Sequence, residues 1–167
     1  MIGALKEFCG WLAGTALSNT IQTTTWIIPT LQTIHILSVA VLFSSAILVD
    51  LRIWRLLQRD VPLPEVARRF LPAIWPLLLV LLLTGSLLIV GEPRRSLLNS
   101  TFLLKMALLL VAIVLTVGLQ VPLSRWPDFW DGSPTRRVAG QLLATLSILV
   151  WCGILFAGRW IAYTQVE

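Results

Sequence analysis

The chain has 167 residues, of which 57% are hydrophobic and only 13% are charged. Soluble domains are about 45–50% apolar and about 25% charged, so this composition excludes an ordinary water-soluble fold and makes lipid the solvent for much of the chain. The formal net charge of +5 does not indicate nucleic-acid binding, because the arginines flank apolar stretches, where they orient a membrane protein. The length allows one domain, and two cysteines cannot form a disulfide framework.

The first segment of interest is amphipathic. Residues 4–17 carry apolar side chains at helical spacing, with Lys6 and Glu7 off the apolar face. This pattern predicts a short helix lying in the membrane interface, although an ordinary packing segment explains it equally well. The early charges and the lack of a small-residue cleavage site predict no cleavable signal peptide.

Four apolar segments follow, each close to the ~20 residues that a spanning helix needs. They cover residues 26–51, 70–90, 101–121 and 137–163. The basic loop after the first segment contains Pro62 and Pro64, which predict a break there. Small residues favour close helix contact; they occur at Thr84-Gly85-Ser86, at Gly140 with Ala144, and at Gly153 with Ala157. We predict an all-α, integral membrane four-helix bundle, with a short N-terminal interfacial helix, as a single membrane domain over residues 1–167.

Charge asymmetry predicts the orientation, since four spans place both termini on one side. The loops after the first and third spans are rich in arginine: Arg52, Arg55, Arg59, Arg68, Arg69, Arg125, Arg136 and Arg137. The other side has only Lys6, Arg94, Arg95 and Arg159 outside the spans. The positive-inside rule then predicts a multi-pass protein of the bacterial cytoplasmic (inner) membrane with both termini periplasmic. Tryptophans should form two interfacial belts, Trp11, Trp26 and Trp160 outside and Trp54, Trp75, Trp126 and Trp130 inside.

The first span contains the only histidine of the chain, His35. Polar residues recur around it every three to four positions, as Gln32, His35, Ser38 and Ser45. Such a stripe should face the bundle interior, because lipid offers no hydrogen-bond partners. Ionisable groups inside a membrane are costly and are therefore functional candidates by default.

Two cations are expected at the depth of His35. Lys105 lies in the first turns of the third span, and Arg159 lies near the end of the fourth. Snorkelling of Lys105 to the interface explains its position equally well, and Arg159 beside Trp160 fits an interface anchor. At the inner end of the first span, Asp50 and Arg52 predict a local ion pair or a helix-to-loop contact.

Three interpretations of His35 stay open. It is a core histidine bonded to a neighbouring helix, an axial ligand of a haem iron, or a proton-handling or quinone-contacting group. In the haem interpretation, Lys105 and Arg159 pair with the propionates. No His/Cys/carboxylate cluster has zinc spacing, no glycine-rich phosphate loop is present, and soft ligands for copper are few.

Three stretches carry a family resemblance, TLQTIHILSVAVLFSSAILVDLRIW, FLLKMALLL and AGRWIAY. Together they resemble an uncharacterised family of small bacterial four-span membrane proteins, over nearly the whole chain. More distantly, the chain is similar to copper-resistance D-type membrane proteins and HemJ-type protoporphyrinogen oxidases, which place a histidine in an early span and a lysine at the start of a later one. The HemJ-type likeness implies that His35 binds haem and that Lys105 is its companion. The chain departs from that pattern in having no second histidine and no aromatic-rich first helix.

The leading hypothesis is an integral membrane haem b protein for electron transfer or porphyrin redox chemistry. His35 would ligate the iron, and the cofactor-binding residues would be His35, Lys105, Arg159, Gln32 and Ser38. The sixth haem position would be open, or filled by Lys105 or by His35 of a second copy. The alternatives are a non-catalytic membrane subunit or scaffold of a larger complex, and a transporter of a small solute or metal. The expected partners are the lipid bilayer and a second copy or another membrane subunit, and no nucleic acid.

Overall fold

The computed structural model describes residues 2–57, 60–126, 129–161 and 163–164. Within these ranges it contains helices and no strand. The seven helices of the described residues are α1 (Ile2–Ala13), α2 (Ala16–Thr23), α3 (Ile27–Ile53), α4 (Leu63–Gly91), α5 (Pro93–Leu97), α6 (Ser100–Arg125) and α7 (Pro134–Trp160). Among them α3, α4, α6 and α7 are long and apolar enough to cross a membrane. The predicted all-α bundle of a multi-pass membrane protein is therefore confirmed.

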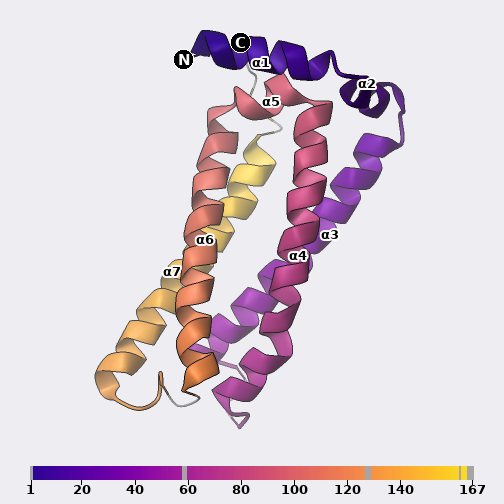
Figure 1. Cartoon of the computed structure of the whole chain (residues 1–167). Coiled ribbons are helices and arrows are strands. Elements are labelled where there is room, and N and C mark those ends of the chain that lie inside the picture. The colour runs from indigo at the N-terminus through magenta and orange to yellow at the C-terminus, as the bar shows by residue number, and fades with distance from the viewer. Residues whose placement is uncertain (1, 58–59, 127–128, 162, 165–167) are drawn as a thin grey trace.

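The long helices form two antiparallel hairpins, α3 with α4 and α6 with α7 (Figure 1). The hairpins are joined mainly by contacts between α3 and α7. Helix α1 lies across one end of the bundle, where both termini and α5 are also found (Figure 1). We call this end the α1 end; the other end, with the connections after α3 and α6, is the loop end.

The predicted N-terminal helix is split in the structure. α1 ends at Ala13, and α2 begins at Ala16 after Thr15, whose hydroxyl oxygen accepts a hydrogen bond from Ser18 N at 3.3 Å. This is a typical N-cap, and it satisfies a backbone donor that the start of the helix leaves unpaired. The hydroxyl of Ser18 donates to Val90 O at 2.7 Å, so α2 is fastened to the end of α4. On α1, Phe8 and Trp11 remain exposed, as an interfacial helix requires.

The helix ends differ from the predicted ones where proline was taken as a breaker. α4 begins at Leu63, not near residue 70, because Pro64 lies in its first turn, where no backbone N–H is needed. α6 continues through Pro122 to Arg125. The short helix α5 was not predicted, since five residues show no measurable periodicity.

The exterior of the bundle, like its core, carries many large apolar side chains. Buried residues form one cluster at mid-bundle around Leu42, Ile74 and Trp151, and a second toward the loop end around Ile53 and Trp130. Large apolar side chains on the outside, such as Leu82, Leu110, Val114 and Leu149, are more than half exposed. An exposed apolar surface of this kind fits contact with lipid.

The prediction that Trp130 belongs to the inner interfacial belt is wrong. Trp130 is only 7% exposed, packs against Gly140 of α7, and its Nε1 donates to Leu119 O at 3.4 Å. It is therefore a core residue of the loop end and does not belong to an interfacial belt. Trp54, Trp75 and Trp126 are exposed, as predicted for a belt.

Candidate functional site

His35 is held by a residue of the neighbouring helix. Its Nδ1 lies 2.8 Å from Oγ1 of Thr84 on α4. The same hydroxyl donates its single proton to Val80 O, at 2.7 Å. With that proton on Val80 O, Thr84 accepts and the imidazole donates in the His35–Thr84 bond. This arrangement is compatible with the tautomer that carries the ring proton on Nδ1 and has a free lone pair on Nε2, the form of histidine that binds metals.

The approach of α3 to α4 at this point depends on a glycine. A Cβ atom on Gly85 would lie 3.4 Å from Cε1 of His35, at the near limit of ordinary contact. The small, polar patch predicted in the second span therefore receives the imidazole ring. It provides both the hydrogen-bond acceptor, Thr84, and the space, Gly85.

Lys105 comes to the site from the other hairpin. Its side chain is partly buried and lies along α7, where a Cβ on Gly158 would be 3.7 Å from Nζ. It is close enough to His35 to interact with it electrostatically. Within the described part of the chain, no carboxylate forms an ion pair with Lys105. An ammonium group in this position can balance the charge of an anionic ligand.

The other predicted site residues lie in different surroundings. Arg159 is exposed; it donates to the hydroxyl of Tyr163 at 2.9 Å, and its guanidinium lies 5.3 Å from the centre of the Tyr163 ring. Gln32 is exposed, whereas Ser38 is only 7% exposed. The contacts thus bring together His35, Thr84 and Gly85, with Lys105 close enough to His35 for an electrostatic interaction, while the contacts of Arg159 fit the interface-anchor interpretation.

A groove at the α1 end contains arginines that the sequence did not mark as candidates for the site. It has a volume of about 450 Å³, and its lining includes Ile28, Gly91, Arg94, and Arg95 in an ion pair with Glu92 at 3.0 Å. Ile28 precedes His35 by seven residues on the same face of α3, which is about 10 Å along a helix axis. The groove therefore lies outward of His35 along the seam between α3 and α4. No motif marked these arginines, because their relation to His35 appears only when the hairpin is folded.

A single histidine can ligate a metal only if the cofactor supplies the other ligands. Among the described residues, no group of three or more His, Cys, Asp or Glu could hold a bare metal ion. A haem needs only an axial ligand from the protein, because its porphyrin supplies the equatorial ones. An imidazole with a free Nε2, and with Nδ1 hydrogen-bonded, fits that role.

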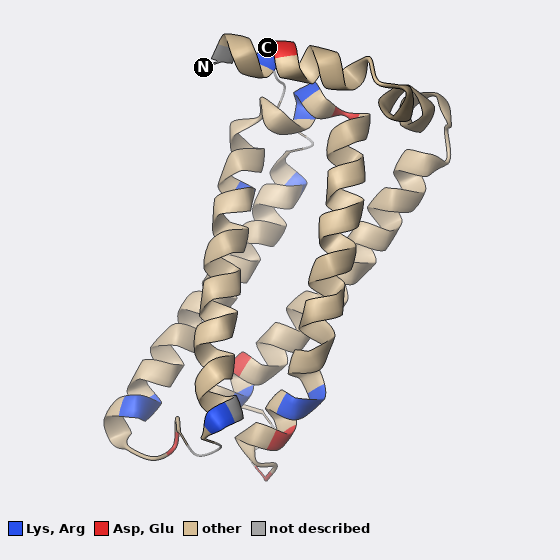
Figure 2. Cartoon of the chain, viewed as in Figure 1, with Lys and Arg blue, Asp and Glu red and all other residues tan. Residues whose placement is uncertain are grey.

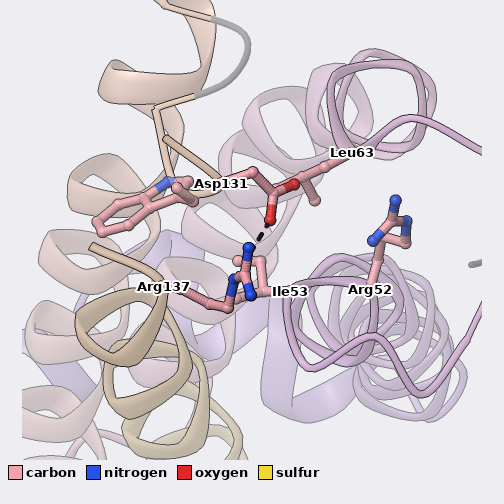
Figure 3. Close-up of a pocket in the computed structure, with 6 residues that line it drawn as sticks. Arg52, Ile53, Leu63, Asp131 and Arg137 are labelled. Carbon is pink, nitrogen blue, oxygen red and sulfur yellow. Dashed lines mark ion pairs between the residues drawn. The ribbon is translucent and has the colours of Figure 1, made fainter. Parts of the chain in front are cut away.

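Polar side chains also gather at the loop end (Figure 3). Asp131 pairs with Arg55 at 2.6 Å and with Arg137 at 3.8 Å. Arg52 is buried and its Nε donates to Val61 O at 2.8 Å, which is the predicted helix-to-loop contact. The alternative, an Asp50–Arg52 ion pair, is not among the ion pairs of the described residues; Asp50 is buried, and Ser147 of α7 lies close enough to interact with its carboxyl group.

Comparison with known proteins identifies the family but adds no activity. No curated protein and no solved structure matches the chain. The model of a family of unknown function, DUF6644, matches residues 8–164, which is nearly the whole sequence. The chain therefore belongs to DUF6644, a family of unknown function.

Proposed function

We propose that the protein binds haem b in the membrane and serves electron transfer or porphyrin redox chemistry. One observation carries the proposal: Nδ1 of His35 is held by Thr84, so Nε2 is the nitrogen available to ligate iron. The distant similarity to HemJ-type proteins, with a histidine in an early span and a lysine in a later one, supports the same assignment.

The residues around His35 would have distinct tasks. Thr84 orients the imidazole, and the bond to its hydroxyl raises the basicity of Nε2. Lys105, without a carboxylate partner among the described residues, would pair with a propionate. A bound haem b would supply one-electron redox chemistry, and the apolar surroundings would keep water from it.

The orientation belongs to the same proposal. Most cationic side chains lie at the loop end, and the middle of the bundle is nearly free of charge (Figure 2). Such a distribution supports a cytoplasmic loop end. It corresponds to a bacterial inner-membrane protein with both termini in the periplasm.

The absorption spectrum of the purified protein tests haem binding. From haem-replete cells, the wild type should carry a Soret band that shifts on reduction. The band should be lost in His35→Ala and kept in Thr33→Ala, a control on the same helix whose exposed hydroxyl bonds only to its own backbone, at Pro29 O. A folded but colourless wild-type preparation would contradict the proposal.

A non-catalytic scaffold is the second candidate, because the His35–Thr84 bond also joins two helices directly. In that case the exposed arginines of the loop end, among them Arg68, Arg69, Arg125 and Arg136, would form the docking surface for another membrane subunit or a second copy. A colourless protein that loses a crosslinked membrane partner on Arg68→Glu, but keeps it on Arg94→Glu at the opposite end, would favour this function.

A further inference from the structure

Asp50 is a buried acid that the proposed function does not use. It lies in the last turns of α3 and is 2% exposed. Ser147 of α7, which is equally buried, lies close enough to interact with its carboxyl group, but Oδ2 has no hydrogen-bond partner. A buried polar atom without a partner is costly and is seldom kept without a reason.

Among the described residues, no cation forms an ion pair with this carboxyl group. Charged groups of the packed elements that lie toward the loop end are Arg52 on α3, Glu65, Arg68 and Arg69 on α4, and Arg136 and Arg137 on α7. Arg52 bonds to the carbonyl of Val61, Arg137 pairs with Asp131, and Arg136 lies over the Phe129 ring. None of the ion pairs among the described residues includes Asp50. An unpaired carboxylate in apolar surroundings takes up a proton in preference to remaining charged.

A cavity of about 10 Å³, the space for a single water molecule, lies at the loop end of α3, one turn beyond Asp50, which does not itself line it (Figure 3). Its lining includes Ile53, Leu63, Asp131 and Arg137. Ile53 is three residues beyond Asp50 and so shares its face of α3. Nε of Arg137 is buried without a hydrogen-bond partner. A water here would have polar partners in Arg137 and Asp131, as buried waters require.

We propose that Asp50 is a proton-exchange site, which takes up and releases a proton at the loop end through this cavity. A hydronium ion that reaches Oδ2 from the cavity transfers its proton to the carboxylate, which leaves water and a neutral carboxylic acid. Release reverses the step. Ser147 holds one side of the carboxyl group, while Oδ2 stays free to accept the proton. The proposal is independent of haem, since Asp50 lies in the half of the bundle opposite to His35.

Infrared spectroscopy of the full-length protein in lipid tests the site. The wild type should show the C=O stretch of a protonated carboxylic acid, absent in Asp50→Asn and retained in Asp131→Asn, which removes an exposed carboxylate. The band should shift in D₂O, because the proton exchanges. Two results would overturn the proposal: no such band assigned to Asp50, or a band that never shifts in D₂O, which would make Asp50 a sealed structural group.

The same substitution, leucine to phenylalanine, at two positions of α4 tests whether protons reach Asp50 through the cavity. Leu63→Phe should fill the cavity and slow the D₂O shift of the Asp50 band. Leu82→Phe adds the same bulk to the outside of α4, where Leu82 is 64% exposed, and should leave the rate unchanged. Circular dichroism checks that both variants fold; should Leu63→Phe unfold, Leu63→Met replaces it. Equal exchange rates in folded variants would overturn the route through the cavity.

Discussion

At the scale of single residues, the chemistry of His35 depends on the proton of another side chain. The Thr84 hydroxyl gives its proton to the backbone of its own helix and is left as an acceptor for Nδ1. A side chain of the same shape without the hydroxyl would leave Nδ1 unpaired and the ring free to turn. Thr84 thus controls which nitrogen of His35 faces a ligand.

We expect Thr84→Val to weaken haem binding about 10–100-fold, the usual effect of losing a partner that orients a metal ligand. The helical content should not change, because valine has nearly the shape of threonine. Thr33→Val is the control, since the Thr33 hydroxyl bonds to Pro29 O within α3. Haem titration followed at the Soret band gives both affinities; equal affinities would show that Thr84 does not orient the ligand.

Lys105 and Arg159, the two predicted propionate partners, should contribute differently to haem affinity. Lys105→Met should lower haem affinity, because it removes a partly buried cation that interacts with His35. Arg159→Met should change it little, because Arg159 is exposed and bonded to Tyr163. The same titration compares the variants, and a larger loss in Arg159→Met would reverse the assignment.

The sequence reveals the ionisable members of the site but not their partners. His35 and Lys105 stand out because polar groups are rare in apolar spans. Thr84 is 49 positions from His35 and is an ordinary residue in a helix. Likewise, Asp50 is visible in the sequence, but its unpaired oxygen depends on how α7 packs against α3. Such facts depend on the pairing of helices, which a single sequence does not specify.

At the scale of helices, glycines mark close contacts of α7. A Cβ on Gly153 would lie 3.3 Å from Cδ1 of Leu108 on α6. At Gly140 it would lie 2.9 Å from Cε3 of Trp130, which is too close for any real contact. The small-residue spacing in the fourth span therefore correctly indicated close packing, and Trp130 is one of the partners.

Gly140→Ala should destabilise the protein by about 1–3 kcal/mol, the usual cost of overpacking a core, because the Trp130 ring must move. Gly118 on α6 is the matched control, since a Cβ there would meet nothing within 4 Å. Gly118→Ala should be neutral or stabilising by up to ~1 kcal/mol, from helix propensity. Unfolding in detergent, followed by circular dichroism, measures both; similar stabilities would contradict the packing argument.

The long helices were predictable because hydropathy alone requires them. The ends of these helices were harder to predict. For example, α4 starts at Leu63 because Pro64 occupies a position where proline is tolerated. The break between α1 and α2 depends on the Thr15 cap, which the amphipathic pattern does not show. Local capping therefore decides boundaries that periodicity leaves open.

At the scale of the whole molecule, charge divides the bundle into two unlike ends (Figure 2). The sequence predicted four spans and this asymmetry, because both follow from composition along the chain. It did not predict that α1 lies across the bundle, nor that α3 packs against α7 (Figure 1). Those features depend on contacts between side chains and distant parts of the chain. One example is the buried thiol of Cys9 on α1, which donates to the carbonyl of Pro93 on α5.

The asymmetry predicts the orientation in the membrane. A reporter that is active only in the cytoplasm should be inactive at the C-terminus and active when inserted between α3 and α4. The reason is the excess of arginine at the loop end, which the positive-inside rule places in the cytoplasm. Strong activity at the C-terminus would contradict the orientation.

The most direct test of the central claim, that Nε2 of His35 ligates haem, is chemical rescue. His35→Gly removes the ligand and leaves space for free imidazole. The absorption spectrum of the haem-loaded variant, oxidised and reduced, should lack the bands of the wild type and regain them when imidazole is added. If His35→Gly gives the wild-type spectrum without imidazole, His35 is not the ligand and the account is wrong.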